Sequence, residues 1–275
     1  MAATPTVTLA DDQSPGSDLA WMWICNHDWD DWAIRVLHAN RELAGAPGIT
    51  PEPVARPWDT LHRRTLPPGH PGPEPEHVVI DGDPRLVLSG VEGPGILVVG
   101  ARGQGLLKAM HIGSTAEWLL ASPPVPLVIA RHGRPTQRLL ASVDGSRDSR
   151  TAVEAALALP WIRGLEVIVL GVQETGFHPQ ESVERTAADF RAAGARVEGI
   201  AYGPNDPKSY LSVRDIILDL AREHDVDLMT LGSRGVGGWD AHRVGSVASA
   251  LARHAPCSVL IAHHSWGADR LGKQA

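Results

Sequence analysis

The second half of the chain alternates short apolar runs with amphipathic stretches, the pattern of a sheet covered by helices. The apolar runs predict buried strands at 139–143, 166–172, 195–201, 227–232 and 258–262. Helical periodicity predicts helices at 149–159, 181–194, 212–224 and 246–254. Ser149 is placed to cap the first of these helices. Because most of the strands are apolar on both faces, we expect a parallel sheet with helices on both sides.

The first half follows the same plan less regularly. Its expected strands are 7–9, 33–37, 77–80, 96–99 and 127–130. A Pro-rich insertion at about 45–77 holds nine prolines between Pro47 and Pro75, so we expect a short helix or a loop there. Trp21, Cys25 and Trp29 share one face of a helix in the tryptophan-rich segment 21–32, which predicts a core seam.

A constant offset of 132 residues relates the two halves. It superimposes two Gly-rich segments, 100–115 and 232–247, and it also superimposes 123–131 on 255–263 and 8–17 on 140–149. A single offset that fits the start, the middle and the end of both halves predicts a tandem repeat. We expect domains at 1–132 and 136–264, then a tail at 265–275. The expected fold is α/β, with two tandem Rossmann-like domains, each an open five-stranded parallel sheet with helices on both faces.

Each Gly-rich segment lies between a strand and a helix. Glycine lets the backbone turn sharply and approach a ligand, and the first N–H groups of the following helix have no partner within it. Together with the helix dipole, these groups favour a bound phosphate. Asp12 and Asp144 follow the first strand of each half, at the edge of the sheet where the Gly-rich segments also lie. Arg102 and Arg234 are equivalent positions from which a guanidinium can reach a phosphate.

Purely structural roles remain open for these residues. Ser114 opens the sequence Ser-Thr-Ala-Glu, a capping box in which its hydroxyl serves its own helix. The aspartates are also common turn residues, and the glycines are also common turn positions. The spacing does not match a P-loop, because Leu106 stands where that motif requires lysine.

The pattern Gly-x2-Gly-x9-Gly-Ser after the fourth strand, with Asp-Gly-Ser after the first, resembles the universal stress protein family. The match runs through the second half, including 143–146 and 255–263, and the whole chain resembles a tandem member. One branch of that family binds ATP, holding phosphates and ribose with the Gly motif and contacting the nucleoside with the aspartate. The resemblance implies the following nucleotide-binding residues: Asp144, Gly232, Gly235, Gly245, Ser246 and Val247 in the second half, and Asp12, Gly100, Gly103, Gly113, Ser114 and Thr115 in the first. The first half departs from the pattern where Gln13 replaces the glycine after Asp12.

Charge and composition exclude several classes of function. The 275 residues carry a net charge of −7, which argues against a nucleic-acid surface. The two cysteines, Cys25 and Cys257, give no disulfide framework, and neither a leader nor a membrane span is visible, so we expect a cytoplasmic protein. Thirteen histidines are scattered, and the one adjacent pair, His263–His264, has no ligand cluster around it in the sequence, so we expect no metal site.

No catalytic set can be assembled from sequence spacing, so we expect a regulator and not an enzyme. The expected ligand is ATP, bound with or without Mg²⁺. We expect ATP to change the conformation of the protein or its choice of partner. Two alternatives stay open. One is an interaction module with one or no working nucleotide site, able to form a homodimer by pairing the edges of its last strands. The other is a slow ATPase.

Overall fold

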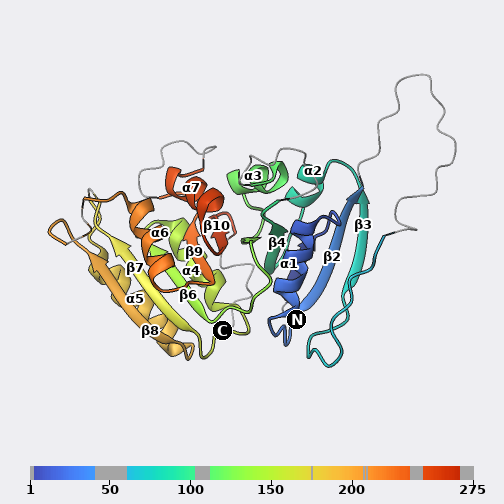
Figure 1. Ribbon diagram of the computed structural model, residues 1–275, viewed down its shortest axis with the longest axis horizontal. Helices are drawn as coiled ribbons and strands as arrows, with labels where there is room; N and C mark the ends of the chain where they lie inside the picture. The colour runs from blue at the N-terminus through green and yellow to red at the C-terminus, as the bar shows by residue number, and fades with distance from the viewer. Residues whose placement is uncertain are drawn as a thin grey trace, which may run out of the picture.

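One sheet runs through the whole molecule (Figure 1). The computed structural model describes residues 3–40, 61–102, 112–174, 176–206, 208, 210–235 and 244–266. Among these residues the strands number ten, in the order β3-β2-β1-β4-β5-β10-β9-β6-β7-β8. They are β1 (Thr6–Ala10), β2 (Ala33–Asn40), β3 (Glu76–Asp81), β4 (Gly95–Gly100), β5 (Leu127–Ala130), β6 (Arg138–Val143), β7 (Glu166–Val172), β8 (Arg196–Tyr202), β9 (Leu228–Gly232) and β10 (Ser258–Ala262).

Within each half the strands are parallel, as the sequence predicts. β1 pairs with β2 and β4, and at the equivalent place β6 pairs with β7 and β9. The chain therefore winds outwards in one direction from β6 and in the other direction from β9. The carboxyl ends of these two strands flank the point where the direction of winding reverses, which is where sheets of this kind bind ligands.

The two halves join edge to edge through their last strands. β5 and β10 pair antiparallel, with Ile129 opposite Val259 and Leu127 opposite Ile261. The edges that the sequence offered for a homodimer are therefore used within one chain. The edge strands of the described sheet are β3 and β8, which lie at opposite ends of the molecule (Figure 1).

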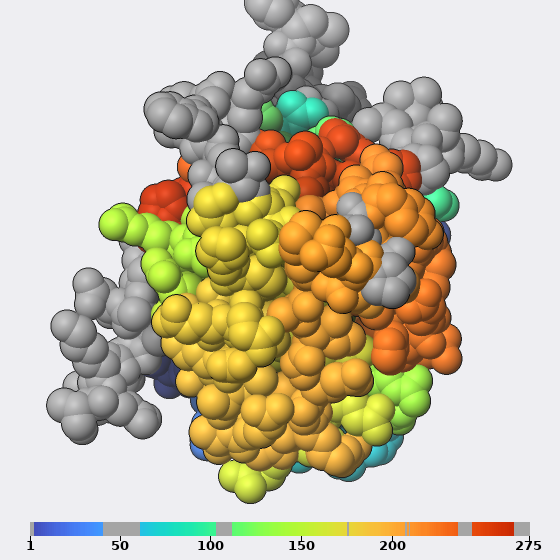
Figure 2. Space-filling model, turned by 90° about the vertical axis from the view of Figure 1, so that its left-hand side faces the viewer, coloured from blue at the N-terminus to red at the C-terminus, as the bar shows by residue number. Residues whose placement is uncertain are grey.

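Seven helices flank the described sheet. They are α1 (Pro15–Cys25), α2 (Pro84–Ser89), α3 (Ser114–Ala121), α4 (Arg147–Leu157), α5 (Pro179–Ala192), α6 (Val213–Glu223) and α7 (Ser246–His254). In the second half, α4 and α5 pack beside each other, while α6 and α7 form a second pair. Figure 2 views this half from its outer end, where residues of β7, α5 and β8 are coloured yellow to orange.

Two expectations about helices are wrong. Ser146, not Ser149, caps α4, because Ser146 is the extended residue immediately before the first helical one. Its Oγ accepts the N–H of Ser149 at 3.0 Å. In the tryptophan segment, α1 ends at Cys25, so Trp29 is not on its face. Trp29 is nevertheless fully buried, and its Nε1 donates to the carbonyl of Ile24 at 2.8 Å, so it is a core residue although the helix ends before it.

Aromatic and polar contacts hold the halves together beyond the strand pairing. Trp161 of the second half packs edge-on against Trp23 of the first, with ring centroids 5.8 Å apart. Arg253 of α7 pairs with Glu117 of α3. Trp266, which the sequence placed in the tail, is buried, and its Nε1 lies 3.4 Å from the carbonyl of Gly93. The interface is therefore a packed core, as well as a seam between two strands.

The connection between β2 and β3 differs from its counterpart in the second half. Residues 41–60 lie outside the described part of the chain, and 61–75 contain no helix, in agreement with the sequence. Arg64 in this stretch forms a buried, bidentate ion pair with Asp11, with N–O distances of 2.8 and 2.9 Å. This pair holds the stretch against the carboxyl end of β1.

Candidate functional site

The turn after β6 is held in a fixed shape. Asp144 Oδ1 accepts the backbone N–H of Ser146 at 2.9 Å, and Gly145 adopts a φ of +76° that favours glycine. The hydroxyl of Ser146 donates to the carbonyl of Arg234 at 3.2 Å. The turn that carries Asp144 is thereby tied to the loop after β9, as expected for two neighbouring parallel strands.

The glycines after β9 give this loop its close contacts. A Cβ on Gly232 would lie 2.6 Å from the backbone nitrogen of Ser149, so only glycine lets the strand end pass this near to α4. A Cβ on Gly235 would lie 2.8 Å from Asp144 Oδ2. Asp144 and Gly235, which are distant in sequence, are therefore neighbours. The structure brings together the aspartate and the Gly segment, as the sequence predicts.

The N-terminus of α7 completes the second-half arrangement. Gly245 is the N-cap, and its N–H donates to the carbonyl of Ser233 at 2.9 Å. Within the described residues no side chain caps this helix, and Ser246 in its first turn is exposed, with Val247 beside it. Uncapped N–H groups and the helix dipole make such an end favourable for an anion. Residues 236–243, between Gly235 and the helix, lie outside the described chain.

The first half repeats this framework. Asp12 Oδ1 accepts the N–H of Ser14 at 3.1 Å, and Gly113 N–H donates to the carbonyl of Ala101 at 2.8 Å. Ser114 and Thr115 lie in the first turn of α3, where Ser114 is exposed as Ser246 is in α7. The predicted site residue Gly103 lies outside the described residues.

The capping box proposed for Ser114 does not form. The N-cap of α3 is Gly113, and among the described residues no side chain bonds to this cap. The carboxylate that would complete the box, Glu117, instead pairs with Arg253 across the interface between the halves. The hydroxyl of Ser114 is therefore not used to cap its own helix.

The surroundings of the first-half site are more crowded. Gln13 holds the turn with a φ of +58°, a conformation that costs a non-glycine residue energy. Its side-chain amide donates to the carbonyl of His62 at 2.9 Å, so part of the Pro-rich insertion runs against this turn. A Cβ on Gly16 would lie 1.5 Å from the carbonyl oxygen of Arg102, and one on Gly100 would lie 2.4 Å from the backbone of Gly16. The start of α1 thus packs directly on the loop after β4.

The structure also gathers residues that the sequence did not connect. Asp148 in the first turn of α4 lies beside His263 and His264, which follow β10. The sequence around the histidine pair did not indicate this carboxylate. Asp148 comes from a distant segment of the chain, and no local spacing signals the contact. A second unexpected feature is Arg234, whose Nε is buried without a hydrogen-bond partner among the described residues.

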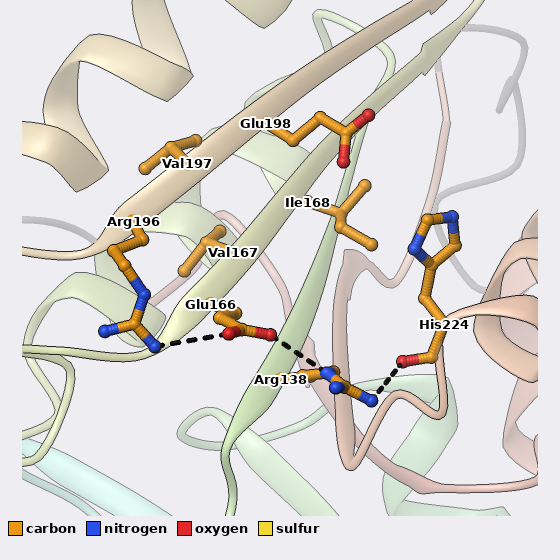
Figure 3. Close-up of a pocket in the computed structure, with 8 residues that line it drawn as sticks. All are labelled: Arg138, Glu166, Val167, Ile168, Arg196, Val197, Glu198 and His224. Carbon is orange, nitrogen blue, oxygen red and sulfur yellow. Dashed lines mark hydrogen bonds and ion pairs between the residues drawn. The ribbon is translucent and has the colours of Figure 1, made fainter.

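A cavity of about 330 Å³ lies elsewhere, near the amino ends of β6, β7 and β8 (Figure 3). Glu166 in its wall bonds Arg138 at 2.9 Å and Arg196 at 3.3 Å, so these charged groups satisfy one another. Arg138 is at the start of β6 and Asp144 follows its end, roughly 20 Å apart along the strand. This cavity is consequently not part of the site around Asp144.

A family comparison matches the second half of the chain. Residues 135–263 match the Universal stress protein family. Two universal stress proteins of Mycobacterium tuberculosis, from strains CDC 1551 and H37Rv, are each 26% identical over 183 residues. That alignment covers 62% of this chain and 62% of each relative, so more than a third of each relative lies outside it.

Solved structures support the fold over a longer stretch. The crystal structure of a universal stress protein from Archaeoglobus fulgidus covers 96% of this chain and 99% of its own, with a TM-score of 0.67 and 20% identity. A universal stress protein in complex with cAMP covers 46% of this chain at 25% identity and a TM-score of 0.35, a similarity too low to bear on the ligand of this chain. Across the described residues, no helix is both long and apolar enough to cross a membrane.

Proposed function

We propose that this chain, which belongs to the universal stress protein family through residues 135–263, binds an adenine nucleotide in its second half. The proposed domains are 1–132 and 136–264, and the proposed site lies at the carboxyl ends of β6 and β9. ATP is the ligand we put first, as a regulatory ligand. The observation that carries the proposal is the contact between Asp144 and Gly235 beside an uncapped helix N-terminus.

The phosphate end of the proposed ligand faces backbone donors. The first N–H groups of α7 and the exposed hydroxyl of Ser246 supply hydrogen bonds, and the helix dipole supplies a favourable field. This kind of site requires no concentrated positive charge, which is consistent with a net charge of −7. Gly232 and Gly235 keep the loop free of side chains where a phosphate must approach the backbone.

The nucleoside end of the proposed ligand faces Asp144. One of its carboxylate oxygens is taken by the N–H of Ser146, and the other points towards Gly235. A carboxylate held in this way accepts hydrogen bonds from hydroxyls of a ribose or from an amino group. Gly145 and Ser146 fix its position, since both belong to the turn that is bonded to Arg234.

The first half is the weaker candidate. It has the same framework around Asp12, yet Gln13 and the stretch at 61–66 crowd the turn. Close packing of Gly16 on Arg102 also fixes the start of α1. We therefore expect one occupied nucleotide site per chain, in the second half.

Calorimetric titration of ATP, with and without Mg²⁺, into the full chain tests the proposal. We expect one ATP per chain. Gly235→Ala should weaken binding at least tenfold, because the new methyl group displaces the Asp144 carboxylate. Gly103→Ala, at the equivalent position of the first half, is the matched control and should leave the affinity unchanged. Absence of heat at millimolar ATP, or a loss caused by Gly103→Ala and not by Gly235→Ala, would refute this assignment.

A second candidate function is an interaction module whose pocket is inactive. The crowding around Gln13 favours it for the first half. Since β5 and β10 pair with each other, a homodimer would need another surface, such as the β3 or β8 edge. Light scattering that finds a stable dimer, together with no nucleotide binding, would support this function over the first. A phosphate-release assay that matches the buffer blank would remove the slow ATPase alternative.

A further inference from the structure

We propose that Asp148, His263 and His264 form a binding site for one divalent transition-metal ion, of which Zn²⁺ is the reference case. Each of the three offers one ligand atom, and these atoms all lie within 4.8 Å of one another. The ligands come from two segments, the first turn of α4 and the residues after β10. The site is independent of the nucleotide proposal, because none of its ligands is assigned there.

The carboxylate is buried and already oriented. Asp148 is 3% exposed, and its Oδ1 accepts both the backbone N–H and Nδ1 of His264, at 3.0 and 2.7 Å. Its Oδ2 accepts the hydroxyl of Ser233 at 2.7 Å. The oxygens are therefore held as acceptors, as a metal ligand requires.

His263 supplies the observation that points most directly to a ligand. It is 7% exposed, and its Nδ1 lies 2.7 Å from Ser265 Oγ and accepts the Ser265 N–H at 3.2 Å, whereas its Nε2 is buried with no hydrogen-bond partner in the described parts of the chain. A buried polar atom without a partner is costly, and such atoms are rare. A metal at Nε2 requires the ring proton on Nδ1, where Ser265 Oγ accepts it in place of the N–H bond from Ser265.

The donor set selects the class of metal. Two imidazoles and one carboxylate suit Zn²⁺, Ni²⁺ or Co²⁺, whereas Mg²⁺ prefers oxygen ligands and retained water. Bonds of about 2.0–2.2 Å require the three atoms to draw closer than their present spread. The side chain of His264 is 45% exposed and can make that movement. A metal on His264 Nδ1 displaces the proton donated to Asp148, and in the neutral ring this proton moves to Nε2.

The cluster is not a by-product of the repeat. At an offset of 132 residues, the first half has Gly16 in place of Asp148, Arg131 in place of His263 and His132 in place of His264. The guanidinium of Arg131 donates to the carbonyl of Ala252 and so takes part in the interface. One metal per chain is therefore expected, in the second half.

The test is a titration of Zn²⁺ into the full chain in competition with a chromophoric chelator. The protein is first stripped with EDTA and dialysed, and no nucleotide is present, so the result does not depend on the proposed ATP site. We expect one tight Zn²⁺ per chain and at least a tenfold weaker affinity for both His264→Gln and His263→Gln. His224→Gln, which removes a partly exposed histidine outside the cluster, is the matched control and should bind like the unaltered protein.

A second readout distinguishes loss of the metal site from misfolding of the variant. Because the His264 side chain is partly exposed, His264→Gln is expected to keep the circular dichroism spectrum and the melting temperature of the metal-free protein. Co²⁺ added to the unaltered protein should give the visible absorption of a four- or five-coordinate site, and His264→Gln should lose it. Binding to several equivalent weak sites, or unchanged Zn²⁺ affinity in both His264→Gln and His263→Gln, would overturn the proposal.

Discussion

Lowering the pH should loosen the junction between the two halves, because His27 bridges them as a neutral ring. Its Nδ1 lies 2.6 Å from the carbonyl of Trp23, and its Nε2 accepts the backbone N–H of Thr136 at 2.9 Å. The ring also packs on Trp161, with centroids 4.2 Å apart. A second proton on Nε2 would remove the acceptor for Thr136 and place a charge in a buried aromatic cluster.

The size of the effect follows from the pKa. Burial is the main cause that lowers the pKa of His27 from 6.5 to about 4; His132 adds to the decrease, while the Trp23 carbonyl, Asp28 and Asp227 oppose it. The unfolded chain therefore takes up this proton near pH 6.5, whereas the folded chain resists it until about pH 4. Stability is complete above pH 6.5 and is lost as the pH falls through this window. A pKa difference of this size corresponds to about 3 kcal/mol in full, and about 2 kcal/mol of it is lost by pH 5.

Urea unfolding followed by tryptophan fluorescence measures this loss. The His27→Gln variant keeps an amide that can donate and accept hydrogen bonds but cannot take up a proton in this range. We expect the unaltered protein to lose about 2 kcal/mol more than His27→Gln between pH 7.5 and pH 5. Because other buried histidines contribute equally to both proteins, the difference isolates His27. Equal losses in the two proteins, or an NMR titration that places the pKa of His27 near 6.5, would refute the reasoning.

Two further predictions concern the packing of the first half, both measured by urea unfolding. Arg64→Met leaves the buried carboxylate of Asp11 without its partner and should cost roughly 3–5 kcal/mol. Arg35→Met, which removes an exposed ion pair, should cost less than about 1 kcal/mol, and equal losses would contradict the buried pairing. Gly16→Ala puts a methyl group into the carbonyl of Arg102 and should cost at least about 1–3 kcal/mol, whereas Gly90→Ala meets only ordinary contacts; a neutral Gly16→Ala would show that α1 can move away.

The fold could be predicted because its information is local. An apolar run such as 258–262 is buried on both faces in the structure, so its pattern alone identifies a strand. The offset of 132 residues relates the two halves, and the common carboxyl edge of the parallel strands predicted that Asp144 lies near the Gly-rich segment. The prediction of Ser149 as the N-cap was wrong by three residues. Two serines lie near the start of α4, and only the backbone conformation decides which of them is the cap.

The contacts that the sequence missed are long-range and leave no periodic signal. Pairing of β5 with β10 depends on how two finished domains meet, and nothing in either strand encodes its direction. Arg64 lies within the Pro-rich insertion, so its distance to Asp11 along the chain reveals nothing about their distance in space. The Asp148 cluster combines an ordinary helix-start aspartate with a histidine pair, and either feature alone is common.

One position explains much of the difference between the halves. Gly16 and Asp148 are equivalent in the repeat, and each lies in the first turn of a helix against the loop after the fourth strand of its half. In the first half the carbonyl of Arg102 fills the space, so no side chain fits there. In the second half Gly232 is close to the Asp148 backbone and Cβ, and the carboxylate extends towards Ser233 and His264. A framework with the same strand order can thus use one copy for tight packing and keep ionisable side chains in the other. The proposed metal site falls in the second half for this reason, and the Gly235→Ala and His264→Gln variants distinguish the proposed nucleotide site from the proposed metal site.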